Sequence, residues 1–245
     1  MVKEKSASSV PLMKRDPKFR DTVIQLMRSQ SYRELAAAQL FGYGLQFVPD
    51  IKSLKFITWH IQEETEHYIA VATLYKDHVG ESVESWVNER LSSKPLPTIS
   101  SFLDLAIAQW LYDRGGFWQL CEYRECSWEP YRTIVGKIIK EERGHQDHGQ
   151  KIAVTLCKSL KDKDKKIAQK SFELWLRQGL LSFGRPNSEG GKYAISVGLK
   201  KRDSAECMKD FMKDITPAIK EAGLNLPPRD KFNVELPDDL EWPKA

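Results

Sequence analysis

The chain has 245 residues and a net charge of +4, so it can bury a sizeable core but is too weakly basic to indicate a dedicated nucleic-acid binder. No apolar run approaches the ~20 residues of a membrane-spanning helix, so we expect neither a nucleic-acid nor a membrane partner. Anionic small molecules remain compatible with the mild positive charge.

The predicted elements are helices throughout, because no stretch alternates apolar and polar residues as a strand does. After a loose N-terminal segment over residues 1–16, apolar side chains recur with helical spacing, beginning with Val23, Leu26 and Met27. Breaks between helices coincide with turn-forming pairs such as Pro49-Asp50. The predicted helices cover residues 18–46, 51–78, 83–91, 102–124, a long segment ending near 158, 167–183, 192–201 and 204–222.

The segment Lys158–Lys166 alternates lysine with aspartate and is expected to be a charged, solvated connection between two helices. It separates a helical part of about residues 18–158 from additional helices and an irregular tail over residues 159–245. We expect both parts to belong to one all-α domain spanning residues 1–245.

Cysteines occur without any Cys-x-x-Cys spacing, at Cys121, Cys126, Cys157 and Cys207. In a chain without a recognisable secretory signal, so few cysteines are typical of reduced thiols. The chain is therefore expected to be cytoplasmic.

A carboxylate followed by a distant Glu-x-x-His motif occurs twice in the chain. Glu34 lies 30 residues before Glu64-Thr-Glu-His67, and Asp113 lies 29 residues before Glu142-Arg-Gly-His145. Residues i and i+3 share one helix face, and about 30 residues suffice to follow one helix, turn and return antiparallel. Two such hairpins that face each other would bring four carboxylates and two histidines to one point.

Apolar residues surround both motifs, including Ile57, Ile61, Val71, Ile138 and Ile139. Carboxylates within apolar helices cost free energy unless they are paired or bound to a metal. A metal site is therefore favoured over the alternative that these residues form solvated polar faces.

One carboxylate from each of two helices plus Glu-x-x-His from each of two others is the ligand set of ferritin-like di-iron and di-manganese bundles. The pattern predicts a ferritin-like four-helix bundle with additional C-terminal helices, whose catalytic metal ligands are Glu34, Glu64, His67, Asp113, Glu142 and His145. Four carboxylates offset the charge of two Fe(II) ions, although Mn or a mixed Mn/Fe pair is also compatible. We expect O2 as co-substrate and an external electron donor, because no flavin, nicotinamide or iron–sulfur motif is recognisable.

Neighbouring residues have less specific roles. His60 could orient a ligand from outside the metal site, whereas His148 is more simply a solvated or locally bonded histidine. Glu63, Glu66 and Glu141 are alternative ligands, but each lies about 100° around the helix from its neighbouring predicted ligand and is expected to face solvent or an outer partner.

The third predicted metal-binding helix has two unusual features. Gly115-Gly116 follow the predicted ligand closely and indicate either tight helix packing or local deformability, as in π-bulges at functional sites. The same helix carries four aromatic residues, which are expected in the core rather than around a substrate: Trp110, Tyr112, Phe117 and Trp118.

Several stretches resemble those of one protein family: Gln109-Trp-Leu-Tyr-Asp113, Lys140-Glu-Glu-Arg-Gly-His-Gln146, Phe183-Gly-Arg-Pro-Asn187 and Thr216-Pro217. Over about residues 20–242 the chain is similar to the catalytic subunits of bacterial multicomponent phenylacetyl-CoA epoxidases, which are ferritin-like di-iron oxygenases. The six ligand positions match that family's pattern, including Asp rather than Glu at position 113.

The resemblance implies that one oxygen atom of O2 is added across the aromatic ring of a CoA thioester, as a step of phenylacetate catabolism. It also implies a catalytically silent paralogous scaffold subunit, with a homo-oligomer as the alternative, and a separate NAD(P)H-dependent reductase. The similarity ends near Trp242, so we expect the family's helical C-terminal extension to be missing. Lys158–Lys166 and Arg185 are candidates for contacts with the CoA phosphates.

The main hypothesis is a monooxygenase that epoxidises or hydroxylates a CoA thioester or a related aromatic or organic acid. One alternative is a ferritin-like iron-binding protein or ferroxidase without an organic substrate. A second is a scaffold subunit of an oxygenase complex, a role that would tolerate loss of ligands, whereas this chain keeps all six.

Overall fold

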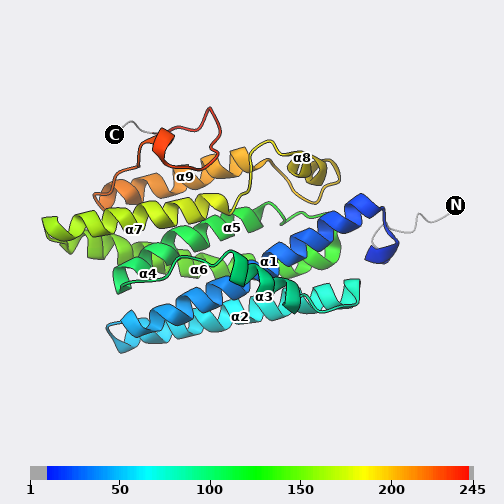
Figure 1. Ribbon diagram of the computed structural model, residues 1–245, viewed down its shortest axis with the longest axis horizontal. Coiled ribbons are helices and arrows are strands. Elements are labelled where there is room, and N and C mark those ends of the chain that lie inside the picture. Colours follow the sequence, from blue (N-terminus) through cyan, green and yellow to red (C-terminus); the bar gives the residue numbers. More distant parts are fainter. Residues whose placement is uncertain (1–9, 243–245) are drawn as a thin grey trace.

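The computed structural model describes residues 10–242, and within that range every regular element is a helix (Figure 1). The fold is all-α, a ferritin-like bundle with extra helices, as predicted. Its α-helices are α1 (Pro17–Gly44), α2 (Ile51–Val79), α3 (Glu84–Ser93), α4 (Phe102–Ala108), α5 (Arg114–Cys121), α6 (Glu129–Ser159), α7 (Asp162–Leu181), α8 (Glu189–Ser196) and α9 (Ser204–Glu221). A π-helical turn, η4 (Gln109–Asp113), joins α4 to α5, and short 3-10 turns cover Leu12–Lys14, Leu45–Phe47 and Arg229–Lys231.

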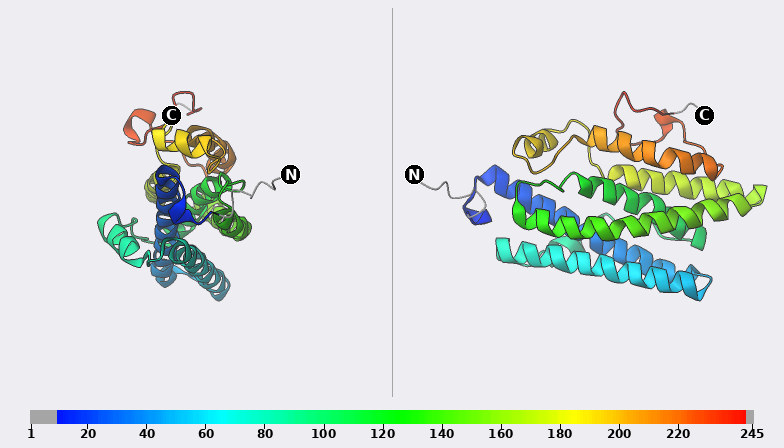
Figure 2. Two further views of the ribbon diagram at one scale, coloured as in Figure 1. Left: turned by 90° about the vertical axis from the view of Figure 1, so that its right-hand side faces the viewer. Right: turned by 180° about the vertical axis from the view of Figure 1, so that it is seen from behind.

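The bundle consists of α1, α2, the run α4–η4–α5, and α6. Both views show α1 and α2 together along one side, with α7 and α9 on the opposite side of α4, α5 and α6 (Figures 1 and 2). The first two helices begin at aspartate N-caps, because the Asp16 side chain accepts a hydrogen bond from the Phe19 N–H and Asp50 accepts one from the Ser53 N–H. Gly80, with a φ of +90°, ends α2.

The third bundle helix is interrupted, which corrects the prediction of one continuous helix over residues 102–124. The π-helical turn lies between two helices that approach its backbone through glycines. A Cβ on Gly149 of α6 would lie 2.6 Å from the Trp110 nitrogen, and one on Gly179 of α7 would lie 2.5 Å from the Leu111 oxygen. A Cβ on Gly115 would likewise lie 2.5 Å from the Gly179 oxygen. Close packing therefore explains Gly115, and the π-helical turn directly precedes it.

Polar contacts attach the extra helices to this third helix. Asp104 on α4 accepts hydrogen bonds from Trp175 Nε1 at 2.6 Å and Ser171 Oγ at 2.5 Å, both on α7. The buried Arg114 on α5 pairs with Asp214 of α9 at 2.9 Å. These contacts hold α7 and α9 in fixed register against the helix that carries a predicted ligand.

Other boundaries differ modestly from expectation. Residues 162–166, predicted to be a connection, form the first turn of α7, where Asp162 and Asp164 complement the positive end of the helix dipole. The expected loose segment lies partly outside the described residues, and within them Leu12 is buried in the core. No helix in residues 10–242 is long and apolar enough to cross a membrane. All four cysteines are unpaired.

Candidate metal site

The six predicted ligands converge from α1, α2, η4 and α6, and all of them are buried. They fall into two adjoining groups, within each of which the candidate ligand atoms lie within 4.8 Å of one another. The first group contains Glu34, Glu64, His67 and Glu142. The second contains Asp113 and His145 together with His60, which the sequence suggested only as an outer partner.

Buried polar atoms without partners mark the centre of this cluster. Nδ1 of His67 lies 3.5 Å from a Glu34 oxygen and 3.4 Å from a Glu142 oxygen, but makes no hydrogen bond. Nδ1 of His145 and Oδ2 of Asp113 are also unpartnered among the described residues. Leaving such atoms unsatisfied is costly. One cation in each group would satisfy these atoms, the first contacting Nδ1 of His67 and the second contacting Nδ1 of His145 and Oδ2 of Asp113, so the donor set fits a carboxylate-rich metal pair.

The outer nitrogen of each histidine is held by a carboxylate from the opposite motif. Nε2 of His67 on α2 lies 2.9 Å from Glu141 Oε2 on α6, and Nε2 of His145 on α6 lies 2.8 Å from Glu63 Oε2 on α2. Such contacts fix the ring and raise the basicity of the inner nitrogen. Glu63 and Glu141 thus contact the predicted histidine ligands, as expected of outer partners whose role stays a prediction, and Glu66 is exposed.

His60 differs from the other two histidines because both of its ring nitrogens have partners. Its Nε2 lies 3.0 Å from Glu64 Oε1, and its Nδ1 lies 2.8 Å from Nε2 of Gln109. Oε1 of Gln109 in turn lies 3.0 Å from Nδ1 of His148, whose ring stacks on Phe56. If the Gln109 amide donates to Nδ1, the His60 Nε2–H is directed at the carboxylate, the arrangement expected of an outer partner. No local pattern pointed to Gln109, because its role depends on the π-helical turn.

The cluster is electrostatically unfavourable without bound cations. Burial and neighbouring carboxylates raise the pKa of Glu64 and of Asp113 well above their usual values. Burial opposes protonation of His67, but the carboxylates of Glu142 and Glu34 outweigh it and raise the pKa of His67 to about 12. Protons thus supply positive charge that metal ions would otherwise supply.

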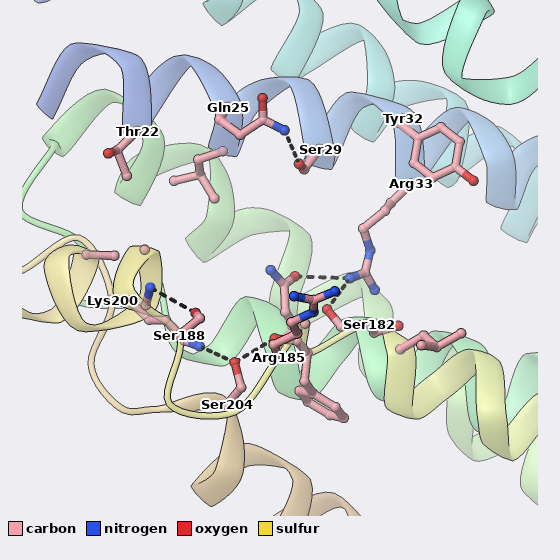
Figure 3. Close-up of a pocket in the computed structure, with 18 of the residues that line it drawn as sticks. Thr22, Gln25, Ser29, Tyr32, Arg33, Ser182, Arg185, Ser188, Lys200 and Ser204 are labelled. Carbon is pink, nitrogen blue, oxygen red and sulfur yellow. Dashed lines mark hydrogen bonds between the residues drawn. The ribbon is translucent and has the colours of Figure 1, made fainter. Parts of the chain in front are cut away.

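A large cavity lies beside the cluster, between α1, the segment after α3, the end of α7, α8 and the start of α9 (Figure 3). Its volume is about 1170 Å³, ample for a large organic ligand. Asp21 is the acidic residue in its lining, whereas the basic residues are Lys18, Arg33, Arg90, Lys94, Arg185 and Lys200. The cavity therefore favours an anionic ligand.

A second cavity of about 20 Å³ reaches the carboxylates of Glu34, Glu64, Asp113 and Glu142. It shares Arg33 and Tyr112 with the large cavity, so these two side chains lie at the boundary between ligand space and metal cluster. Trp110, by contrast, is fully buried, in keeping with its expected core role, whereas Phe117 and Trp118 are partly buried. Tyr112 is buried but lines the large cavity, so the expectation that this residue lies away from ligand space is wrong.

Comparison with known proteins agrees with the expected family. A family model described as phenylacetic acid catabolic protein matches residues 70–236. One subunit of the 1,2-phenylacetyl-CoA epoxidase of Escherichia coli strain K12 is 22% identical over 226 residues, which cover 89% of this chain and 72% of that protein. The family match includes Asp113, Glu142 and His145 but begins after Glu34 and the first Glu-x-x-His motif. The structure places Glu34, Glu64 and His67 in the same buried cluster, independently of the family match.

Proposed function

Because this chain belongs to the phenylacetic acid catabolic protein family, we propose that it is a di-iron oxygenase that uses O2 to epoxidise or hydroxylate an aromatic or related acyl-CoA thioester. The observation that carries the proposal is the set of unpartnered buried atoms, His67 Nδ1, His145 Nδ1 and Asp113 Oδ2, within a cluster of carboxylates. Burying these carboxylates and histidines without a cation would cost free energy, so the presence of the buried cluster favours a bound metal pair.

The six predicted ligands would hold the metal pair, with Glu63 and Glu141 orienting the two histidines from outside. Two bound iron ions would supply electrons to O2. Surrounding apolar packing excludes bulk water, and Gln30 restrains Glu34 through a short hydrogen bond to its Oε1. Nε2 of His60 lies 3.0 Å from Glu64 Oε1, and this contact limits the positions that the carboxylate can take.

A CoA thioester matches the size and charge of the large cavity. Phosphates would contact the basic lining, in which Arg185 takes part as the sequence suggested. Lys158–Lys166 do not line that cavity, and Lys158 and Lys165 instead pair with Glu221 and Asp162 at the surface. The acyl group would then extend toward the boundary formed by Arg33 and Tyr112.

The E. coli relative is named as one subunit of an epoxidase, which supports a partner subunit. A separate reductase remains part of the proposal because the sequence contains no recognisable flavin, nicotinamide or iron–sulfur motif. A ferroxidase without organic substrate is the weaker alternative, because it would have no use for a basic cavity of this volume next to the metal cluster.

The test is anaerobic titration with Fe(II), followed by addition of O2, phenylacetyl-CoA and a chemical reductant or reductase. We expect two irons per chain, O2 consumption that depends on the acyl-CoA, and an oxygenated product by mass spectrometry. Iron oxidation without any acyl-CoA dependence would favour the ferroxidase, and failure to retain iron would overturn both functions. Parallel titration with Mn(II) decides between the metals.

A further inference from the structure

Arg33 lies at the boundary between the two cavities, and its guanidinium has an unusual environment. Arg33 extends from α1 across the large cavity toward the end of α7 (Figure 3). Its Nη1 donates to the carbonyl oxygen of Ser182 at 3.0 Å and makes a longer contact of 3.5 Å with Gln119 Oε1. Within residues 10–242, no carboxylate lies within 4 Å of the guanidinium. Arg33 thus keeps a full positive charge and donor capacity at the inner end of the cavity.

The guanidinium of Arg33 lies close to a glycine. A Cβ on Gly116 of α5 would lie 3.1 Å from Nη2 of Arg33, closer than most real contacts. A side chain at Gly116 would therefore require the guanidinium to shift by a few tenths of an ångström. Gly116 also lines the small cavity that reaches the carboxylates. Nη2 of Arg33 is therefore the guanidinium nitrogen near Gly116, and both residues line the small cavity.

Tyr112 provides a second donor at the same boundary. Tyr112 belongs to the π-helical turn and lines both cavities, and its phenol hydroxyl can donate a hydrogen bond. The small cavity, at about 20 Å³, holds little more than a water molecule, so an aromatic ring cannot pass without displacing these side chains. An organic substrate that approaches the cluster from the large cavity would therefore meet Arg33 and Tyr112.

We propose that Arg33 is a specificity-determining residue that binds the acyl carbonyl oxygen of the substrate, with Tyr112 as a second donor. This inference rests on the proposed acyl-CoA oxygenase function and names the feature of the substrate that the site selects. A carbonyl oxygen is an acceptor that a charged donor binds strongly in a partly dry site. Fixing that oxygen at the boundary sets how far the remainder of the acyl group extends toward the metal cluster.

The test uses two ligands that differ only at the carbonyl: phenylacetyl-CoA and the thioether S-(2-phenylethyl)-CoA. Dissociation constants are measured by calorimetry on the iron-loaded protein without O2, so that no turnover takes place. We expect the thioester to bind roughly tenfold or more tightly than the thioether, in line with a charge-assisted hydrogen bond. In Arg33→Met this ratio should fall to near one, chiefly through weaker thioester binding, and Arg33→Lys should recover part of it.

Arg90→Met is the matched control, since Arg90 lines the same cavity but its guanidinium lies over the Tyr32 ring, 5.7 Å from the centroid. That change should weaken both ligands alike and leave their ratio intact. An unchanged ratio in Arg33→Met, or a ratio near one in the unsubstituted protein, would overturn the assignment of Arg33 while leaving acyl-CoA binding intact. If neither compound bound the unsubstituted protein, the acyl-CoA function itself would fall, and this inference with it.

Discussion

The carboxylate of Glu63 on α2 lies 2.8 Å from Nε2 of His145 on α6, so a residue next to one predicted ligand orients another across the bundle. Glu141 makes the reciprocal contact with His67 at 2.9 Å. These two reciprocal contacts connect α2 and α6, the helices that carry the Glu-x-x-His motifs. Loss of either contact should therefore weaken metal binding.

Replacing Glu63 or Glu141 by glutamine should lower metal affinity by roughly 10–100-fold, because each histidine loses the charged partner that fixes its ring. The measurement is competition for Fe(II) or Co(II) against a chelator of known affinity. Glu66→Gln is the control, since Glu66 is exposed and its contact is with Gln62 on the same helix. Equal affinities in all three variants would show that the outer carboxylates do not support the site.

His67→Ala should lower the iron content below two per chain, because it removes one of the two predicted imidazole ligands. Metal analysis after gel filtration measures the content, and circular dichroism checks that helicity is retained. His78→Ala, on the same helix but packed against Trp128, should keep full iron. Full occupancy with normal turnover in His67→Ala would remove this residue from the ligand set.

The metal-free protein should lose stability as pH rises above about 6.5. His67 keeps its proton in the folded state up to a pKa of about 12, whereas the unfolded chain releases it near the ordinary value of 6.5. Above 6.5 the folded state therefore binds more protons, and this contribution declines by at most about 1.4 kcal/mol per pH unit. Urea unfolding from pH 6 to 9 measures the slope, which should be smaller in His67→Gln. Metal loading should reverse the trend, because ligation requires the deprotonated ring.

Gly115→Ala should destabilise the fold by about 1–3 kcal/mol, since its Cβ would lie 2.5 Å from the Gly179 oxygen and force α5 and α7 apart. Gly136→Ala on α6 is the matched control, because no atom lies within 4 Å of the added carbon. That change should be neutral or stabilising through helix propensity. Denaturant midpoints of the two variants give the comparison, and similar midpoints would argue against the backbone contact.

The helices and the predicted ligands could be read from the sequence because both depend on local spacing. The helix predicted over residues 51–78 corresponds to α2, Ile51–Val79, and its i, i+3 motif puts Glu64 and His67 on one face. The buried cluster contains all six predicted ligands, although their binding of iron stays a prediction. The start of α7 was predicted wrongly because charge alternation, typical of a connection, also suits an exposed first turn.

Features that depend on tertiary contact were not predictable from a single sequence. The sequence offered a π-bulge near Gly115-Gly116 only as an alternative to tight packing, because the close contacts of Gly149 and Gly179 with the π-helical turn come from distant parts of the chain. Arg33 stands next to a predicted ligand, yet nothing local indicates that it spans a cavity to Ser182. The contacts of Glu63 with His145 and of Glu141 with His67 could likewise not be predicted without knowing how α2 and α6 face each other.

The π-helical turn limits which insertions and deletions this part of the chain can tolerate during evolution. A π-turn holds one residue more than the α-helical turn it replaces, so it is equivalent to a single-codon insertion in an otherwise straight helix. Removing one residue from Gln109–Asp113 would rotate α4 by about 100° relative to α5. Gln109 and Asp113 could then no longer both face the cluster. Insertions and deletions within these five positions should therefore be selected against far more strongly than substitutions.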